Sequence, residues 1–160
     1  MAVRKIPGKV KELNIFIDGL GFLGTVEDCK LPQVKTKKEV VNGVVIDVGI
    51  VEDLVFEGTL NIANAEIYKR ATNKSVVVNG KASYLEDNAD KKLNTSMGGF
   101  LEAEMDTLKA GDNMKTKIKM MLNTYVMSMD SDEVYNIDLP NMIAKIGGKD
   151  IYETVRSAVM

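Results

Sequence analysis

The side chains best suited to chemistry in this sequence are carboxylates and lysines that recur at every second position. Three acids on one segment and three lysines on the next follow this spacing: Glu102, Glu104, Asp106, Lys115, Lys117 and Lys119. Two carboxylates on one strand face lie about 7 Å apart by strand rise, a separation that suits glycoside hydrolysis, with Glu102/Glu104 and Asp130/Asp132 as candidate pairs. Facing lysines would keep both carboxylates ionised and remove the required proton donor. We therefore expect that the protein is not an enzyme.

The two charged segments are predicted to form a long β-hairpin over residues 100–107 and 115–128, with a turn at residues 109–112. Side chains alternate between the two faces of a strand. One register places Asp106 opposite Lys115, Glu104 opposite Lys117 and Glu102 opposite Lys119, and it pairs mostly apolar residues on the other face. The simplest interpretation is a solvated sheet face. The second strand would span roughly 45 Å, so it either bends between two sheets or extends to a neighbouring subunit.

Composition argues against several classes of function. The chain has 160 residues, enough for one domain with a hydrophobic core, and a formal net charge of −2, which disfavours binding through neutralised phosphates. It contains no histidine, so the usual zinc sites and Ser-His or Cys-His nucleophiles are absent, and no cofactor or metal is expected. Cys29 follows Asp28, which disfavours a reactive thiolate. No apolar run resembles a signal peptide or a membrane span, so no stable membrane association is expected.

Alternating apolar residues and turn signals predict a mainly-β (α+β) fold: an antiparallel β-sandwich or barrel with one flanking helix, a C-terminal helix and long loops. A first hairpin is expected at residues 13–18 and 22–28. Further strands are expected at residues 44–48, 53–62 (with Ile62 pointing inward), 75–84 and 134–138. Helices are expected at residues 63–71, capped by Asn64, and at 150–159, with Ile151, Val155 and Ala158 on one side. Residues 86–95 are expected to form a mobile loop, and residues 140–146 either a helical turn or a strand.

Two basic segments lack any stripe of apolar residues that could face a core. Residues 1–12 are expected to form an extended, poorly ordered arm, and residues 33–43 a long exposed loop or projecting hairpin. The candidate contact residues in these segments are basic: Arg4, Lys5, Lys9, Lys35, Lys37 and Lys38. Such segments can attract an acidic neighbouring subunit, and the attraction would weaken with salt.

The order of several short motifs resembles one protein family. The N-terminal motifs are Leu13-Asn14-x-Phe16-x-Asp18-Gly19, Gly24-x-Val26-Glu27 and Leu31-Pro32 followed by the lysine-rich loop. The C-terminal motifs are Lys117-x-Lys119, Thr124-Tyr125, Met129-Asp130, Ile137-Asp138 and Asn141-Met142-Ile143-x-Lys145-x-x-Gly148. In this order they resemble the major tail tube proteins of contractile-tailed bacteriophages and R-type bacteriocins. Residues 42–97 match only in their strand-helix-strand layout.

The resemblance implies a single tail-tube domain over residues 1–160 that forms homo-hexameric rings, stacked into a tube inside a sheath. It also implies baseplate and terminator proteins as partners, a lumen that conducts DNA or effectors without specific binding, and a place in the virion tail after assembly in the host cytoplasm. The face that carries Glu102, Glu104 and Asp106 would line the lumen, and the two basic segments would join rings. A phage, a bacteriocin and another injection system remain alternatives. So does a monomeric small β-barrel that binds a ligand, which light scattering would distinguish from a ring.

Overall fold

The computed structural model describes residues 8–17, 21–72 and 74–159. Within these ranges the chain forms one nine-stranded antiparallel sheet, ordered β11-β10-β9-β8-β5-β2-β1-β6-β7, and a separate two-stranded sheet, β3-β4. The strands are β1 (Lys9–Ile17), β2 (Gly21–Lys30), β3 (Thr36–Val41), β4 (Val44–Val51), β5 (Leu54–Leu60), β6 (Val76–Glu86), β7 (Ala89–Met105), β8 (Thr116–Met129), β9 (Asp132–Asp138), β10 (Ile143–Ile146) and β11 (Lys149–Asp150). The helices are α1 (Ala65–Arg70) and α2 (Glu153–Val159). The expected mainly-β fold with two helices is confirmed.

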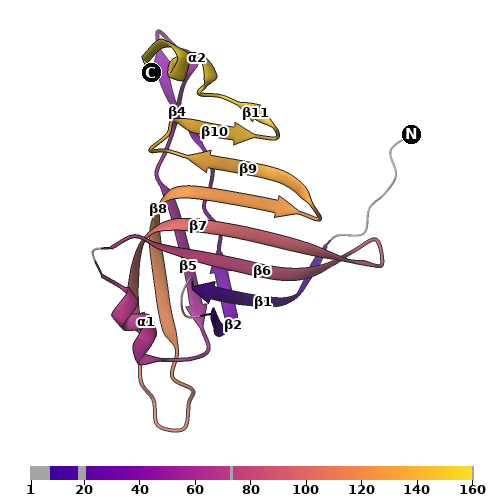
Figure 1. Ribbon diagram of the computed structural model, residues 1–160, viewed down its shortest axis with the longest axis vertical. Coiled ribbons are helices and arrows are strands. Elements are labelled where there is room, and N and C mark those ends of the chain that lie inside the picture. The colour runs from indigo at the N-terminus through magenta and orange to yellow at the C-terminus, as the bar shows by residue number, and fades with distance from the viewer. Residues whose placement is uncertain (1–7, 18–20, 73, 160) are drawn as a thin grey trace.

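Strand β8 bends and so belongs to two parts of the sheet (Figure 1). Its first half pairs with β5 and its second half with β9, while β7 runs along both halves. The bend coincides with a register shift between Gly98 and Gly99 of β7. Bulges increase local bending and twist, and a Cβ at Gly99 would collide with the carbonyl oxygen of Met121 on β8. Of the two outcomes predicted for this long strand, bending is the one observed.

The described strands share one hydrophobic core. Its largest fully buried side chains come from strands far apart in the sequence: Phe56 on β5, Met97 on β7, Met120 and Tyr125 on β8, and Ile137 on β9. Burial of these apolar side chains supplies the main driving force for joining the strands.

Helix α1 begins at the predicted cap, where the Asn64 side chain accepts a hydrogen bond from the Glu66 amide at 3.0 Å. Its residue Ile67 is fully buried. The helix is also attached through its tyrosine, because the Tyr68 hydroxyl lies 2.9 Å from Oγ1 of the fully buried Thr116. No described helix is both long enough and apolar enough to cross a membrane.

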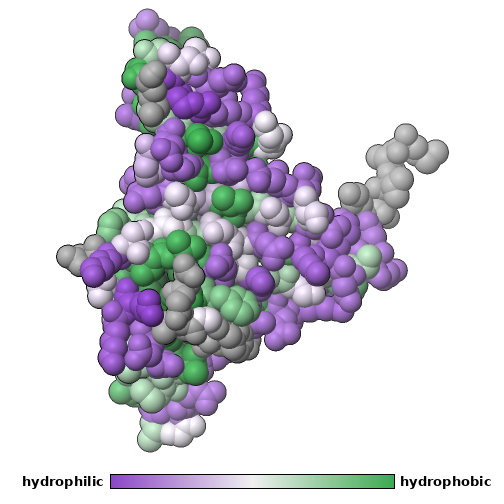
Figure 2. Space-filling view, in the orientation of Figure 1, coloured by the Kyte–Doolittle hydropathy of each residue, from purple (hydrophilic) through white to green (hydrophobic). Residues whose placement is uncertain are grey.

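Several expectations are wrong in detail. Residues 86–95 are not a mobile loop: Asp87 and Asn88 form a tight turn with positive φ, and β7 starts at Ala89. The polar residues there are held by pairing with β6, and the arm they form is mostly hydrophilic (Figure 2). Ile62 does not point inward, since it lies beyond the end of β5 and is 41% exposed.

The ends of the chain also differ from expectation. Residues 9–12 belong to β1 and pair with β6, so they are not a disordered arm, and residues 1–7 lie outside the described ranges. Residues 143–146 form strand β10, which resolves the choice left open at residues 140–146. The expected C-terminal helix starts later than residue 150, since α2 begins at Glu153, and none of the residues in its described span is buried.

Candidate functional site

The charged hairpin is part of a broader surface, here called the charged face, that crosses β2, β5, β8 and β7. Strand pairing builds it as two transverse rows of side chains. One row runs from Lys30 through Glu57 and Lys119 to Glu102, and the other from Asp28 through Thr59 and Lys117 to Glu104. Positive and negative groups alternate along the first row. Opposite charges on facing strand positions are mutually stabilising, which favours this register.

The charged face is hollow and open to solvent. The two rows line an indentation of about 630 Å³ that contains four carboxylates and three lysines. The register predicted for the hairpin is confirmed for Glu102 opposite Lys119 and for Glu104 opposite Lys117. The sequence pattern did not identify the residues on β2 and β5 as part of this surface, because they join it only through strand pairing.

Among the described residues of the charged face, ion pairs occur only at the end next to the β7–β8 turn. Lys117 Nζ lies 3.6 Å from an Asp106 oxygen, and Lys115 Nζ lies 2.9 Å from a Glu27 oxygen. The backbone amide of Thr107, and then Lys117, lower the pKa of Asp106. Hydrogen bonding and attraction to Glu27 raise the pKa of Lys115. Asp106 also donates its amide to the Lys115 carbonyl at 3.0 Å, which closes the hairpin as predicted.

The second candidate surface is the β3–β4 hairpin, which forms its own two-stranded sheet. It contains residues 36–43 of the segment expected to be exposed, and it continues through β4 to Val51. Asn42 and Gly43 both have positive φ, as a tight hairpin turn requires. Five large apolar residues around this turn are exposed: Val40, Val41, Val44, Val45 and Ile46. A two-stranded hairpin is marginally stable in water by itself, and an exposed apolar cluster commonly marks an interaction site.

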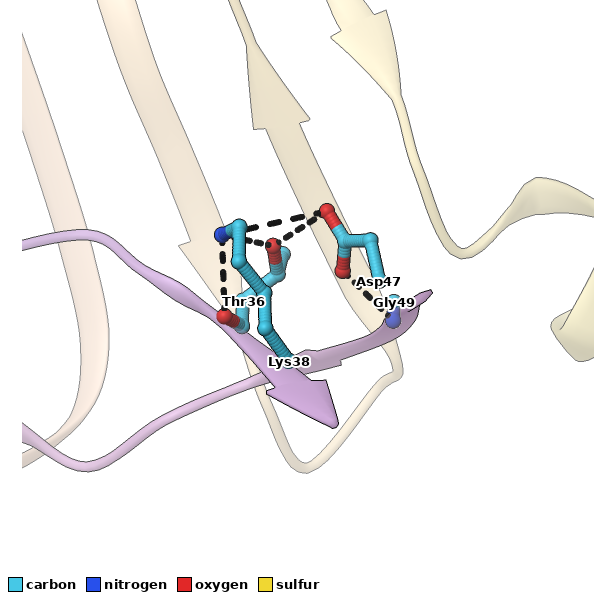
Figure 3. Close-up of polar contacts among 4 residues, drawn as sticks. All are labelled: Thr36, Lys38, Asp47 and Gly49. Atoms are coloured by element: carbon cyan, nitrogen blue, oxygen red, sulfur yellow. Dashed lines mark hydrogen bonds and ion pairs between the residues drawn. The ribbon is translucent and has the colours of Figure 1, made fainter. Parts of the chain in front are cut away.

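The charged side chains of this hairpin lie closer to its base than the exposed apolar residues do, and they interact with one another (Figure 3). Asp47 accepts a hydrogen bond from the Thr36 hydroxyl at 2.8 Å and one from the Gly49 amide at 2.9 Å, and it lies 4.0 Å from Lys38 Nζ. The Thr36 and Gly49 hydrogen bonds are the main causes that lower the pKa of Asp47. Lys37 lies 3.5 Å from Glu39.

The base of the hairpin is attached to the C-terminal segment. The amide of Val51 at the end of β4 donates a buried 2.7 Å hydrogen bond to the Tyr152 hydroxyl, across 101 residues of sequence. Asp150 shapes the turn that presents Tyr152, because it accepts hydrogen bonds from the Tyr152 amide at 3.0 Å and from Arg156 at 2.7 Å. The Arg156 hydrogen bond is the largest cause that lowers the pKa of Asp150.

The predicted contact residues are divided among different environments. Lys35, Lys37 and Lys38 are exposed on the hairpin or at its base, and Lys9 is exposed at the start of β1. Arg4 and Lys5 lie outside the described residues. Lys9 pairs with Leu85 of β6 in the large sheet, whereas Lys37 and Lys38 lie on the separate β3–β4 sheet.

Neither surface has the features of a catalytic or metal site. No group of three or more histidine, cysteine, aspartate or glutamate side chains among the described residues could hold a metal ion. Cys29 lines the hollow of the charged face, and burial, together with Asp28, raises the pKa of its thiol. A raised pKa disfavours the thiolate, as predicted.

Comparison with known proteins gives a consistent result over nearly the whole chain. The family model for phage tail tube protein FII matches residues 7–159. The tail tube protein of Escherichia phage P2 is 26% identical over 165 residues, which cover 94% of this chain and 96% of the relative. The major tail tube protein of Serratia phage KSP20 is 24% identical over 173 residues, which cover 92% of each chain.

Proposed function

This chain belongs to the phage tail tube protein FII family, and from that premise we propose that it is the inner-tube subunit of a contractile injection apparatus, forming stacked hexameric rings around a channel. Membership alone establishes a structural, self-assembling component of the virion tail and confirms that the chain is not an enzyme. The contractile mechanism, the number of subunits in a ring and the cargo are parts of the proposal.

The charged face is the best candidate for the wall of the channel. The observation that carries this assignment is its hollow shape combined with four carboxylates against three lysines. A lumen wall is concave, and in a ring this face would be repeated once per subunit. DNA passing such a wall would find no net positive patch to which it could adhere, because binding of this kind requires clustered basic side chains. Effector proteins would likewise meet a hydrated, mixed-charge surface.

Contacts between rings are assigned to the β3–β4 hairpin and to the N-terminal segment, through Arg4, Lys5, Lys9, Lys35, Lys37 and Lys38. A projecting hairpin with two unpaired strand edges needs a partner, because open edges otherwise promote aggregation. The outer surface would contact a sheath protein, and the tube ends would contact baseplate and terminator proteins. The source particle is a phage, a bacteriocin or another injection system, and assembly precedes release from the host cytoplasm.

Light scattering and electron microscopy test the central proposal. The purified chain, measured by size-exclusion chromatography with light scattering over a wide concentration range, should show a species of six subunits. Negative-stain images at high concentration should show rings and tubes. A monomer at every concentration would refute the proposal.

The lumen assignment needs a separate test on assembled tubes. Glu104→Cys should react with a small maleimide but be protected from a maleimide attached to a large polymer, because the polymer does not enter a narrow channel. Val155→Cys on α2 provides the comparison, and Cys29→Ser removes the background thiol in both variants. Equal labelling of Glu104→Cys by both reagents would place the charged face outside the lumen.

A further inference from the structure

We propose that Asn42 is a site of spontaneous chemical modification, where water converts the asparagine into aspartate or isoaspartate and so places a carboxylate on the tip of the β3–β4 hairpin. Two asparagines of this chain precede a glycine, Asn42 and Asn79. The structure puts Asn42 in an exposed turn and Asn79 in the middle of a sheet. Only Asn42 should therefore react in the folded protein.

The reaction needs no enzyme and consumes only water. The backbone nitrogen of Gly43 attacks Cγ of the Asn42 side chain, and the new C–N bond closes a cyclic imide. The side-chain nitrogen departs as ammonia, together with the proton of the attacking amide. Water then adds to one of the two imide carbonyls and breaks its bond to nitrogen. The product is aspartate or isoaspartate, with one water consumed and one ammonia released in total.

The turn leaves both reacting groups accessible. Val41 pairs with Val44, so Asn42 and Gly43 form a two-residue loop, with φ angles of 52° and 78°. Both residues are exposed, and a Cβ built on Gly43 would meet nothing within 4 Å. Glycine has no Cβ to hinder its nitrogen or to restrict its rotation. The hairpin is a separate two-stranded sheet of marginal stability, so its tip can open locally and bring the Gly43 nitrogen to Cγ of Asn42.

The Asn79-Gly80 pair has the same residue types but is held on both sides. Gly80 lies opposite Ile15 of β1 and Thr95 of β7. Its carbonyl also accepts a hydrogen bond from the Thr95 hydroxyl at 3.3 Å. Rotating this backbone towards a cyclic imide would break the pairing with a neighbouring strand. Opening a strand inside a sheet costs far more free energy than fraying a hairpin tip, so Asn79 is protected.

A third asparagine separates the contribution of the glycine from that of the turn. Asn88 is exposed in the tight turn between β6 and β7, and its φ of 61° is close to that of Asn42. The next residue is Ala89, which has a Cβ beside the attacking nitrogen. The chain thus offers a turn with glycine, a strand with glycine and a turn without glycine.

Peptide mapping by mass spectrometry tests the proposal on the full chain, kept unassembled at low concentration and mildly alkaline pH. The measured quantity is the fraction of side-chain amide converted to acid, and an isoaspartyl methyltransferase detects the isoaspartate product. Asn42 should convert about tenfold faster, or more, than either Asn79 or Asn88. In denaturant, Asn79 should reach the rate of Asn42. Equal rates in the folded chain, or an Asn42 that stays unconverted, would overturn the proposal.

The modification also has a consequence for assembly, which rests on the proposed function. The tip carries no charged side chain between Val40 and Ile46. A carboxylate there is costly to remove from water. Asn42→Asp keeps a turn-forming Asp-Gly pair and should raise the concentration needed for tubes about tenfold or more. Two controls should assemble like the unmodified chain: Asn42→Gly, which keeps an uncharged Gly-Gly turn, and Asn88→Asp, which adds the same charge to the other turn.

The two measurements fail separately. Peptide mapping uses the unassembled chain, so its result stands whether or not tubes form. Tubes of Asn42→Asp at the same concentration as the unmodified chain would overturn the effect on assembly. If the unmodified chain remains monomeric at every concentration, the proposed function fails, and peptide mapping alone decides whether Asn42 is a modification site.

Discussion

Replacing Tyr152 by phenylalanine tests the connection between the C-terminal segment and the projecting hairpin. The change removes one hydroxyl and leaves the ring in place. Tyr152 is buried, and its hydroxyl accepts the 2.7 Å hydrogen bond from the equally buried Val51 amide. In Tyr152→Phe that amide has lost its acceptor at a position from which water is excluded.

The magnitude follows from the cost of an unsatisfied buried donor. Removing one partner so that a buried polar group stays unpaired costs about 1–3 kcal/mol, more than the net value of an average hydrogen bond. For a domain of 160 residues, each kcal/mol lowers the melting temperature by about 2–4 °C. We therefore expect a decrease of roughly 2–12 °C, with most of the secondary structure retained.

Calorimetry or a circular dichroism melt under non-assembling conditions measures the effect. Tyr135→Phe is the matched control, because the Tyr135 ring stacks on Tyr125 with centroids 5.8 Å apart while its hydroxyl makes no hydrogen bond to a described residue. The control should change stability by no more than about 0.5 kcal/mol. Equal melting temperatures for the two variants would refute the claim that the Val51 hydrogen bond stabilises the fold. If the bond also orients the hairpin, Tyr152→Phe should form fewer tubes than the control at the same concentration.

Three further predictions concern the rest of the fold. Gly99→Ala should destabilise the protein by about 1–3 kcal/mol in a urea titration, because its Cβ would collide with the Met121 carbonyl oxygen, whereas Gly8→Ala, with no contact closer than 3.7 Å, should be neutral. Lys117→Ala should leave unfolding nearly unchanged, within about 1 kcal/mol, since its ion pair is exposed, and a larger loss would show that the charged face is structural. The pKa of Asp150 is lower in the folded than in the unfolded chain, so its stabilisation is present above pH 3.8 and is lost as the pH falls through the folded value. Stability curves of the wild type and Asp150→Asn should therefore converge in acid, and parallel curves would contradict this.

Local sequence patterns were sufficient to predict those parts of the fold for which nearby side chains permit only one arrangement. The β7–β8 register follows from the sequence because shifting it by one residue would place carboxylates among apolar side chains and oppose like residues across the strands. Asn64 could be identified as a cap because its side chain satisfies an amide at the start of its own helix. The family could be inferred because many weak motifs occur in one order along the chain.

Pairing between distant segments could not be read from local patterns. Residues 89–95 show no alternation of apolar and polar side chains, so their sequence resembles a loop. In the structure, β6 holds them in a strand through backbone hydrogen bonds, which any sequence can make. The charged face needed β2 and β5 beside β8 before Lys30 and Glu57 could join Lys119 and Glu102.

The attachment of Tyr152 to Val51 spans 101 residues and depends on the complete packing of the C-terminal strands. The sequence by itself therefore determined the family, most strands and the charged hairpin, whose interactions are local. Only the tertiary structure decided which strands lie side by side, where β8 bends and how the hairpin is held. Those features depend on the entropy of closing long loops and on the burial of a shared core, which no short segment encodes.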